Sequence, residues 1–467
     1  MIGSGPNGLT AAIILAQAGV TTTVVESQPT IGGGTRSLAL TLPGFTHDLC
    51  SAVHPMAVSS PAFASFPLPQ HGLEWIHPDA PLAHPLDDGS AAILHPSVEE
   101  TAAGLKQDSS RWRRAVGPLA SRWAELSADI LGPLKAPRHP LLLSRFGLLA
   151  AWPASFAARA LFGTPPARAL FAGVAAHSVI PLNWPLSSAI AWALILAAHS
   201  VGWPIPRGGS QAIANALASY FTSLGGKIVV NVRVRSLDEF RDADLVMCDL
   251  TPSGLLEIAG DRFPSSFAAR LKRYVYGPGV FKMDWALDRP TPWKSPACAL
   301  AATVHLGGTL DEIASSERAP WEEQTTKRPF VLFVQPSLFD ASRAPAGKHT
   351  AWAYCHVPNG STEDMSDRIE AQVERFAPGF RSCILARSAM NTADLALHNS
   401  NLHGGDISGG AQMLGQFFFR PTRHTYRTPI RGLYLCSAST PPGGGVHGMC
   451  GYYAAQYALS DLRFPAN

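Results

Sequence analysis

Residues 1–8, Met-Ile-Gly-Ser-Gly-Pro-Asn-Gly, decide the fold of this chain. Gly3, Gly5 and Gly8 form a G-x-G-x-x-G pattern, which is weak evidence alone but stronger at the start of a helix. Residues 8–18 predict that helix, because small side chains recur along one of its faces and a glycine follows as a C-cap. The pattern therefore predicts a turn at which the backbone can approach a ligand closely.

A strand and an acidic residue follow at the spacing of a dinucleotide-binding unit. The β-branched residues 20–25 predict the strand, and Glu26 closes it about 20 residues beyond the glycines. A carboxylate there can accept a hydrogen bond from a ribose hydroxyl, while the helix N-terminus favours a diphosphate. We predict a Rossmann-type nucleotide site, with a purely structural glycine turn as the alternative. Only Met1 and Ile2 precede the glycines, so we expect the chain to start too late and most of the central first strand to be missing.

Composition places the chain among globular proteins. Of its 467 residues, 46% are hydrophobic and 15% are charged, and this length predicts two domains. The net charge of +3, without a basic run, argues against nucleic acid as a partner. Seven scattered cysteines without a C-x-x-C pair predict neither a disulfide framework nor a metal site. Buried thiols in a reducing compartment are favoured, so we expect a cytoplasmic protein.

The stretch of residues 61–202 has a different composition. Its alanine-rich helical segments carry many Trp, Phe and Leu and are broken by prolines. Packing in a hydrophobic core is the default explanation for these apolar side chains, and the lining of a lipophilic pocket is the more specific alternative. Residues 141–162, with two arginines among apolar side chains, leave a peripheral membrane contact open. The longest apolar run, residues 189–198, is too short to span a bilayer.

The nucleotide-type pattern resumes after this stretch. Arg207-Gly208-Gly209-Ser210 leads into a predicted helix, and residues 227–234 and 244–249 predict two strands. In residues 281–287 the period becomes two, which predicts a half-buried strand of an antiparallel sheet. The fold class is therefore α/β, a Rossmann-type domain with an inserted α+β substrate domain. We assign residues 1–60, 203–260 and 395–467 to the discontinuous nucleotide-binding domain, and residues 61–202 and 261–394 to the substrate domain.

A second glycine-rich loop lies near the C-terminal end. Residues 432–436 predict a buried strand, residues 443–448 (Gly-Gly-Gly-Val-His-Gly) form the loop, and residues 451–459 predict a helix. N–H donors at such a loop can stabilise the negative charge of a reduced flavin. The glycine run 32–34 allows another close backbone approach, and Arg36 beside it can face a phosphate.

With these motifs the chain resembles the phytoene desaturase-like FAD-dependent oxidoreductases over nearly its whole length. Within that family it is most similar to the pyridine-nucleotide-disulfide-oxidoreductase-domain-containing branch, although it lacks the disulfide of that name. In place of the acid that many flavoproteins carry before the final glycines, the chain has Ala438 and Ser439. The resemblance is carried by Gly3–Gly8, Glu26, Ile31–Ser37, Pro206–Gly209, Gly404–Asp406 and Tyr434–Gly448.

The resemblance implies a non-covalent FAD. Its diphosphate would lie at residues 5–8, its adenosine ribose on Glu26 and its isoalloxazine beside residues 444–449. The implied reaction is a desaturation, in which a hydride moves from a C–H of a lipophilic substrate to flavin N5. The candidate bases are His447 first, then His47 and Tyr276. The expected FAD contacts are Gly3, Gly5, Pro6, Asn7, Gly8, Glu26, Gly33, Gly34, Arg36, Ser37, Val232, Ser439, Gly444, Gly445, Val446, His447, Gly448 and Met449.

Two further expectations concern the electron acceptor and the rival functions. The only full dinucleotide fingerprint is already used by FAD, so we expect oxygen or a quinone, and no NAD(P)H, to exchange electrons with the flavin. A flavin-dependent carotenoid or isoprenoid isomerase or saturase would carry the same motifs. So would a non-catalytic flavin-binding protein.

Overall fold

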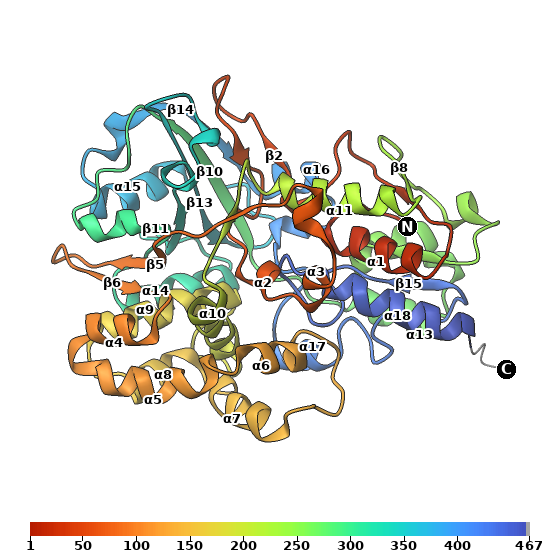
Figure 1. Cartoon of the computed structure of the whole chain (residues 1–467), viewed down its shortest axis with the longest axis horizontal. Helices are drawn as coiled ribbons and strands as arrows, with labels where there is room; N and C mark the ends of the chain where they lie inside the picture. Colours follow the sequence, from red (N-terminus) through yellow and green to blue (C-terminus); the bar gives the residue numbers. More distant parts are fainter. Residues whose placement is uncertain (464–467) are drawn as a thin grey trace.

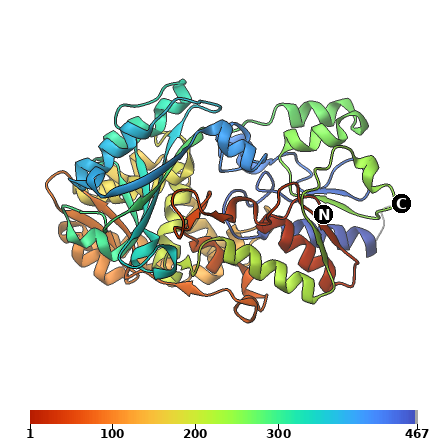
Figure 2. The same cartoon turned by 90° about the horizontal axis from the view of Figure 1, so that it is seen from above.

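The computed structural model describes residues 1–463, and its helices and strands gather into two lobes (Figures 1 and 2). One lobe contains a parallel sheet with α1 (Pro6–Gln17) and α18 (Met449–Arg463), and the other contains a larger sheet covered by helices. The first and last helices of the described chain lie side by side in the first lobe. The expected α/β class is confirmed.

The parallel sheet is assembled from strands that are far apart in the sequence. β1 (Thr23–Val25) pairs with β8 (Lys227–Val229), and β9 (Val246–Cys248) pairs with β15 (Leu433–Leu435). Ile2 joins the two pairs, because it forms parallel bridges to β1 on one side and to β9 on the other. The order across the lobe is therefore β8, β1, Ile2, β9, β15.

Met1 and Ile2 take the position of the central strand. The N–H of Ile2 donates to the carbonyl of Met247, and the N–H of Val25 donates to the carbonyl of Met1, both at 2.8 Å. The expected loss of most of the first strand is therefore seen, but β1 and β9 each keep a partner in Ile2.

Small side chains let α18 pack closely on α1. Ala11 and Leu15 of α1 share a buried cluster with Ala454, Ala455 and Ala458 of α18. The α1 helix ends, as predicted, before a glycine with a φ of +81° at position 19. The lobe is completed by α11 (Gln211–Ser223), α12 (Pro252–Ala259) and α13 (Ser265–Lys272).

The larger sheet has seven strands, in the order β14–β10–β13–β12–β11–β5–β6. β5 and β11 run parallel, and every other neighbouring pair is antiparallel. β5 and β6 come from the stretch that the sequence predicted as helical, so that prediction was incomplete. The bounds are β5 (Ala80–Pro85), β6 (Ala91–Leu94), β10 (Gly279–Leu287), β11 (Ala301–Leu306), β12 (Val331–Val334), β13 (His349–Val357) and β14 (Ile384–Met390).

The β10 strand is buried on both faces, which corrects the predicted half-buried strand. One face carries apolar side chains, such as Trp285, that pack with residues of α15 (Ser366–Phe376). The other face carries Lys282 and Asp284, which form an ion pair and are at most 2% exposed. The β3 strand (His47–Asp48) covers these charges and forms a hairpin with β2 (Ser37–Leu38).

Seven helices form a layer against the other face of the larger sheet (Figure 1). Within the described residues no single helix is long and apolar enough to cross a membrane; the consecutive helices α7 and α8 meet those criteria only together, across a bend of 99°. The seven are α4 (Val98–Gly104), α5 (Ser109–Ala120), α6 (Trp123–Ile130), α7 (Pro140–Ala150), α8 (Ala154–Leu161), α9 (Pro165–Ala175) and α10 (Ser187–Val201). The shorter elements are α2 (Pro55–Val58), α3 (Pro61–Ala64), β4 (Trp75–Ile76), β7 (Ile205–Pro206), α14 (Leu310–Arg318), α16 (Thr392–His398) and α17 (Leu414–Phe418).

Candidate functional site

A cavity of about 1270 Å³ is lined by residues of both lobes. Residues 3–7, Glu26 and residues 33–36 form part of its wall in the parallel-sheet lobe. Apolar side chains of α7 and α10 and side chains of β11–β13 line the part in the other lobe. The volume exceeds the range of about 300–1,000 Å³ that is usual for one small ligand, so the cavity can hold a cofactor together with a substrate.

The turn that leads into α1 tolerates only glycine at its three predicted positions. Gly3 has a φ of +94°, and a Cβ on Gly5 would lie 2.8 Å from Oδ2 of Asp249. A Cβ on Gly8 would lie 2.2 Å from the carbonyl oxygen of Gly3. The N–H of Gly8 donates to Oδ2 of Asp249 at 3.1 Å, and burial raises the pKa of that carboxyl to about 7. Gly8 therefore packs against the side of the turn that faces away from the cavity, while Gly3 and Gly5 line the cavity.

Glu26 is held rigidly at the end of β1. Its Oε2 accepts hydrogen bonds from the N–H of Ser4 at 3.0 Å and from the hydroxyl of Ser4 at 2.6 Å. Its Oε1 accepts one from the N–H of Gln28 at 2.9 Å. The residue is only 5% exposed and lines the cavity. A fixed carboxylate at this place suits a hydrogen bond from a ribose hydroxyl, as the sequence predicted.

Arg36 is a buried cation without an anionic partner in residues 1–463. It is 4% exposed and lines the cavity, and its Nε has no hydrogen-bond partner within that range. Burial lowers the pKa of its guanidinium. Gly33 lies against the glycine turn, since a Cβ there would be 3.1 Å from the Cα of Gly5. A buried charge destabilises the folded protein unless it is paired, so the part of the cavity beside Arg36 and Gly33 fits the diphosphate of a nucleotide.

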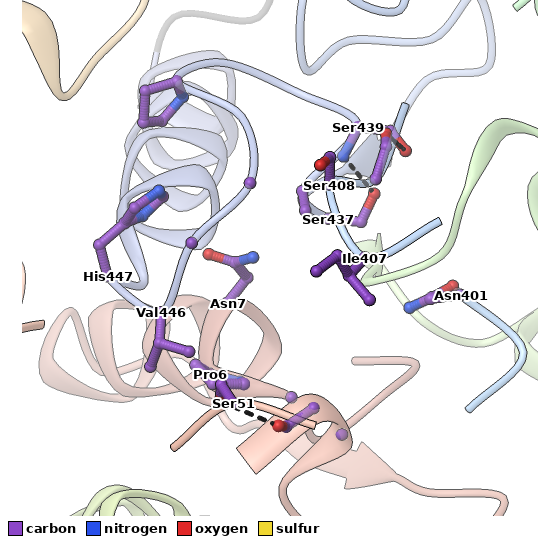
Figure 3. A pocket seen from close by; sticks show the side chains of 18 of the residues that line it. Pro6, Asn7, Ser51, Asn401, Ile407, Ser408, Ser437, Ser439, Val446 and His447 are labelled. Atoms are coloured by element: carbon purple, nitrogen blue, oxygen red, sulfur yellow. Dashed lines mark hydrogen bonds between the residues drawn. The ribbon is translucent and has the colours of Figure 1, made fainter. Parts of the chain in front are cut away.

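The C-terminal glycine-rich loop forms a further wall. Figure 3 shows Asn7, Val446 and His447 on one side of the pocket, with Ser439 and Asn401 across from them. The Oδ1 of Asn7 is buried and has no partner within residues 1–463, which leaves an acceptor for a bound ligand. Backbone groups and the neutral side chains of Asn7, Ser439 and His447 are thus available at this wall, where the sequence has no acid before the glycines.

His447 is poorly placed to act as a base. Its Nδ1 accepts a hydrogen bond from the N–H of Met449 at 3.1 Å, and burial lowers the pKa of the ring to about 4. The neutral ring therefore carries its proton on Nε2, which can donate but cannot accept. The geometry favours a hydrogen-bond donor at this position.

The other two candidate bases do not line the cavity. His47 is 1% exposed and lies between the hydroxyl of Thr41, at 2.7 Å from Nε2, and Oδ1 of Asp284, at 3.6 Å from Nδ1. Burial, with Lys282 nearby, lowers its pKa to about 3. The hydroxyl of Tyr276 lies 2.8 Å from Oγ of Ser253. Both residues therefore have structural hydrogen bonds that the sequence did not predict.

Most of the predicted cofactor contacts meet at one cavity wall. Ser37, Gly8, Gly448 and Met449 do not reach it: the hydroxyl of Ser37 donates to Asp48 at 2.7 Å, and Met449 begins α18. The contacts that line the cavity are Gly3, Gly5, Pro6, Asn7, Glu26, Gly33, Gly34, Arg36, Val232, Ser439, Gly444, Gly445, Val446 and His447.

The histidines on the cavity wall that were not selected as site residues from the sequence include His54 and His177. His54 lies 2.8 Å from the hydroxyl of Ser210, and burial lowers its pKa to about 4. His177 follows α9 and lines the cavity beside Trp203. Neither lies in a motif, so only the tertiary fold identifies them.

Comparisons with known proteins agree with this geometry. The family described as flavin containing amine oxidoreductase matches residues 7–456. The chain is 26% identical to the rat pyridine nucleotide-disulfide oxidoreductase domain-containing protein 2 over 99% of this chain and 93% of the relative. It is 24% identical to a lycopene-forming phytoene desaturase of Paracoccus sp. over 61% of each chain.

Two solved structures share the fold. An oxidoreductase from Methanosarcina mazei has a TM-score of 0.65 at 16% identity, covering 98% of this chain and 99% of its own. A putrescine oxidase bound to putrescine has a TM-score of 0.62 at 16% identity, covering 99% and 98%. At such identities the likeness supports the fold and leaves the substrate open.

Proposed function

Because the chain belongs to the flavin-containing amine oxidoreductase family, we propose that this FAD-dependent oxidoreductase dehydrogenates a lipophilic substrate. The observation that supports this most is the continuity of the cavity. It leads from a dinucleotide-type glycine turn, with Glu26 and Arg36, to a chamber lined by apolar side chains. When bound, FAD supplies a hydride acceptor for a substrate C–H.

The residues of the first lobe would hold FAD in an extended form. Arg36 and the turn at residues 3–7 would face the diphosphate, and Glu26 would accept a hydrogen bond from the adenosine ribose. The loop of residues 444–447 would border the flavin ring. Non-covalent binding is supported by the state of two side chains on the cavity wall that could form a covalent bond to a flavin. The Nδ1 of His447 already accepts a hydrogen bond, and burial raises the pKa of the Cys50 thiol to about 11, so its reactive thiolate is disfavoured. Acid precipitation should therefore release yellow FAD into the supernatant.

The chamber would position the substrate and exclude water. Its wall includes Phe146, Ile190, Leu194 and Trp203, which offer dispersion contacts and few polar groups. A C–H held close to the flavin in such a place needs orientation more than a strong acid or base. This proposal includes no assigned base, since none of the three candidates has a free acceptor on the cavity wall.

We also propose oxygen or a quinone as the electron acceptor. The described residues contain one glycine turn with a following acid, and that site is already assigned to FAD. Rapid, saturable flavin reduction by NADPH in a stopped-flow trace would contradict this acceptor assignment.

We propose that the protein is cytoplasmic and makes a peripheral contact with a membrane. Helices α7 and α8 carry Leu141, Leu148 and Phe156, which are 87%, 72% and 55% exposed. The opposite side of α7 lines the cavity through Leu143 and Phe146. A lipophilic substrate could therefore pass from a bilayer to the chamber along one helix. Co-sedimentation with phospholipid vesicles tests this contact.

The Glu26→Ala variant tests the cofactor assignment. We expect FAD binding to weaken by about 1–3 kcal/mol, because a charge-assisted hydrogen bond to the ribose is lost. Flavin affinity would be measured by titrating the apoprotein with FAD, and Glu322→Ala, an exposed acid outside the cavity, is the matched control. Equal FAD affinity in both variants would refute the role of Glu26. A flavin spectrum that dithionite does not bleach would instead favour the non-catalytic alternative.

A further inference from the structure

A row of three histidines leads inward from the wall of the cavity. The Nε2 of His177 lies 3.0 Å from the Nε2 of His305 on β11. The Nδ1 atoms of His305 and of His84 on β5 lie 2.9 Å and 3.0 Å from the point that a Cβ on Gly173 would occupy. The row ends where the Nε2 of His84 lies 2.8 Å from the carbonyl oxygen of Gly308. Gly173 therefore keeps open the space in which the second and third rings meet.

The carbonyl at the end of the row determines the tautomer of His84 and thereby favours one tautomer of each of the other two rings. A carbonyl can only accept, so Nε2 of His84 carries a proton and its Nδ1 has a lone pair. The Nδ1 atoms of His305 and His84 both lack a hydrogen-bond partner within residues 1–463 and face the same space; two lone pairs there would repel each other, which favours a proton on Nδ1 of His305. The Nε2 of His305 then accepts from Nε2 of His177, and Nδ1 of His177 is left as an acceptor.

All three rings are neutral near pH 7, as this assignment requires. Burial is the largest cause in each case: it lowers the pKa of His84 to about 4, the pKa of His177 to about 3, and the pKa of His305 well below its usual value. His84 and His305 have no exposed surface, whereas His177 is partly accessible from the cavity.

A hydroxyl group on the strand that carries His305 also lines the cavity. Thr303 and His305 are two residues apart on β11, so their side chains share one face of the sheet, about 7 Å apart. Thr303 lines the cavity at 1% exposure, and its Oγ1 has no hydrogen-bond partner within the described chain. Trp203 and Leu332 border the same wall. The ring of His177 and the hydroxyl of Thr303 are thus two neutral polar groups on a cavity wall that also carries apolar side chains.

We propose that this part of the cavity binds a hydroxyl group of the substrate, whose O–H donates to Nδ1 of His177 and whose oxygen accepts from Thr303. The substrate class is then a lipophilic alcohol and not a hydrocarbon, an inference that rests on the lipophilic substrate proposed above. A carboxylate is disfavoured because these neutral groups offer it no cation. An ether or ketone lacks the donor that the His177 ring requires.

Farnesol and its methyl ether are a matched pair of probes for this site, because they differ only in the O–H. Each would be titrated into the FAD-loaded protein while the fluorescence of the cavity tryptophans and the flavin spectrum are recorded. We expect farnesol to bind about tenfold more tightly than the ether, a ratio that one to two net hydrogen bonds support. His177→Phe and the nearly isosteric Thr303→Val should each reduce this ratio several-fold. Ile190→Val, an apolar change in the same chamber, should leave it unchanged.

Equal affinity for the two probes in the wild-type protein would overturn the proposal, and so would failure of both to bind. A ratio that persists in both His177→Phe and Thr303→Val would also overturn it. If His177→Phe does not fold, because it leaves Nε2 of His305 unpaired, Thr303→Val decides the question alone. These experiments measure binding and not turnover. If the farnesol results contradict the hydroxyl site but another lipophilic compound still reduces the flavin, the proposed function holds and only the hydroxyl site is wrong.

Discussion

The Gly451→Ala substitution is expected to destabilise the protein by about 3 kcal/mol or more and to reduce its flavin content. A Cβ on Gly451 would lie 1.8 Å from the carbonyl oxygen of Asn7 and 3.1 Å from the backbone nitrogen of Ala11. These are backbone atoms of α1 and cannot rotate away, so α18 would have to separate from α1. Because α1 carries the glycine turn, its displacement would also disturb the nucleotide site. Urea unfolding and the ratio of absorbance at the flavin and protein bands would measure the two effects.

Gly104→Ala is the control for this substitution. Gly104 is also helical, in α4, but no atom lies within 4 Å of its added Cβ. Alanine is the better helix former, so this variant should gain up to about 1 kcal/mol and keep its flavin. Wild-type stability and full flavin content in Gly451→Ala would show that the close approach of the two helices is not required.

Lowering the pH from 6.5 to 4.5 is expected to destabilise the protein strongly. Six histidines have a pKa that burial lowers to about 3 or 4, and burial lowers the pKa of His305 well below its usual value, whereas in the unfolded chain each titrates near 6.5. The unfolded state therefore binds protons that the native state does not bind. For each such histidine, the free energy of unfolding decreases by about 1.4 kcal/mol for every unit by which the pH is lowered. The six with a pKa of about 3 or 4 are His47, His54, His84, His177, His199 and His447.

Two buried carboxyl groups act in the opposite direction. Burial raises the pKa of Asp249 to about 7 and that of Asp284 to about 6, so the native state holds two protons that the unfolded state releases above pH 4. Seven histidines less these two carboxyls leave a net difference of about five protons, which corresponds to a loss of about 7 kcal/mol for each unit by which the pH falls near pH 5.5. The free energy of urea unfolding, measured at several pH values, gives this slope.

Single histidine variants test the assignment of the slope. His84→Gln should reduce it by about 1.4 kcal/mol per pH unit, because one of the seven contributing histidines is removed. His424→Gln is the control, since that side chain is exposed. A stability that is constant between pH 6.5 and 4.5 would contradict the neutral state of these rings, including those of the histidine row.

The elements with local signals could be predicted from the sequence. The α1 helix, the strand before Glu26 and the strand–loop–helix at residues 433–463 were predicted because glycines and apolar periodicity mark them within short windows. Residues 227–234 were predicted as one long strand, but only the first three form β8, since that is the length that β1 can pair. Boundaries of this kind depend on the partner strand and not on the local sequence.

The groups that meet through the tertiary fold could not be predicted. An alternating pattern such as that of β10 is the same whether its polar face meets water or another part of the protein, so the burial of Lys282 and Asp284 was missed. The residues of the histidine row come from three distant parts of the chain, at positions 84, 177 and 305. No short window contains two of them, and each alone is typical of a structural histidine.

The arrangement of the first lobe has a consequence for protein synthesis. The α1 helix leaves the ribosome early, but the helix that covers Ala11 and Leu15 begins only at residue 449, and β15 begins at residue 433. A nascent chain therefore exposes the apolar side of its first helix until nearly all of the described residues have been made. An exposed apolar surface of this kind binds chaperones and promotes aggregation. We expect the cofactor to enter only after translation has reached α18, so flavin supply and chaperone capacity should limit the yield of folded protein together.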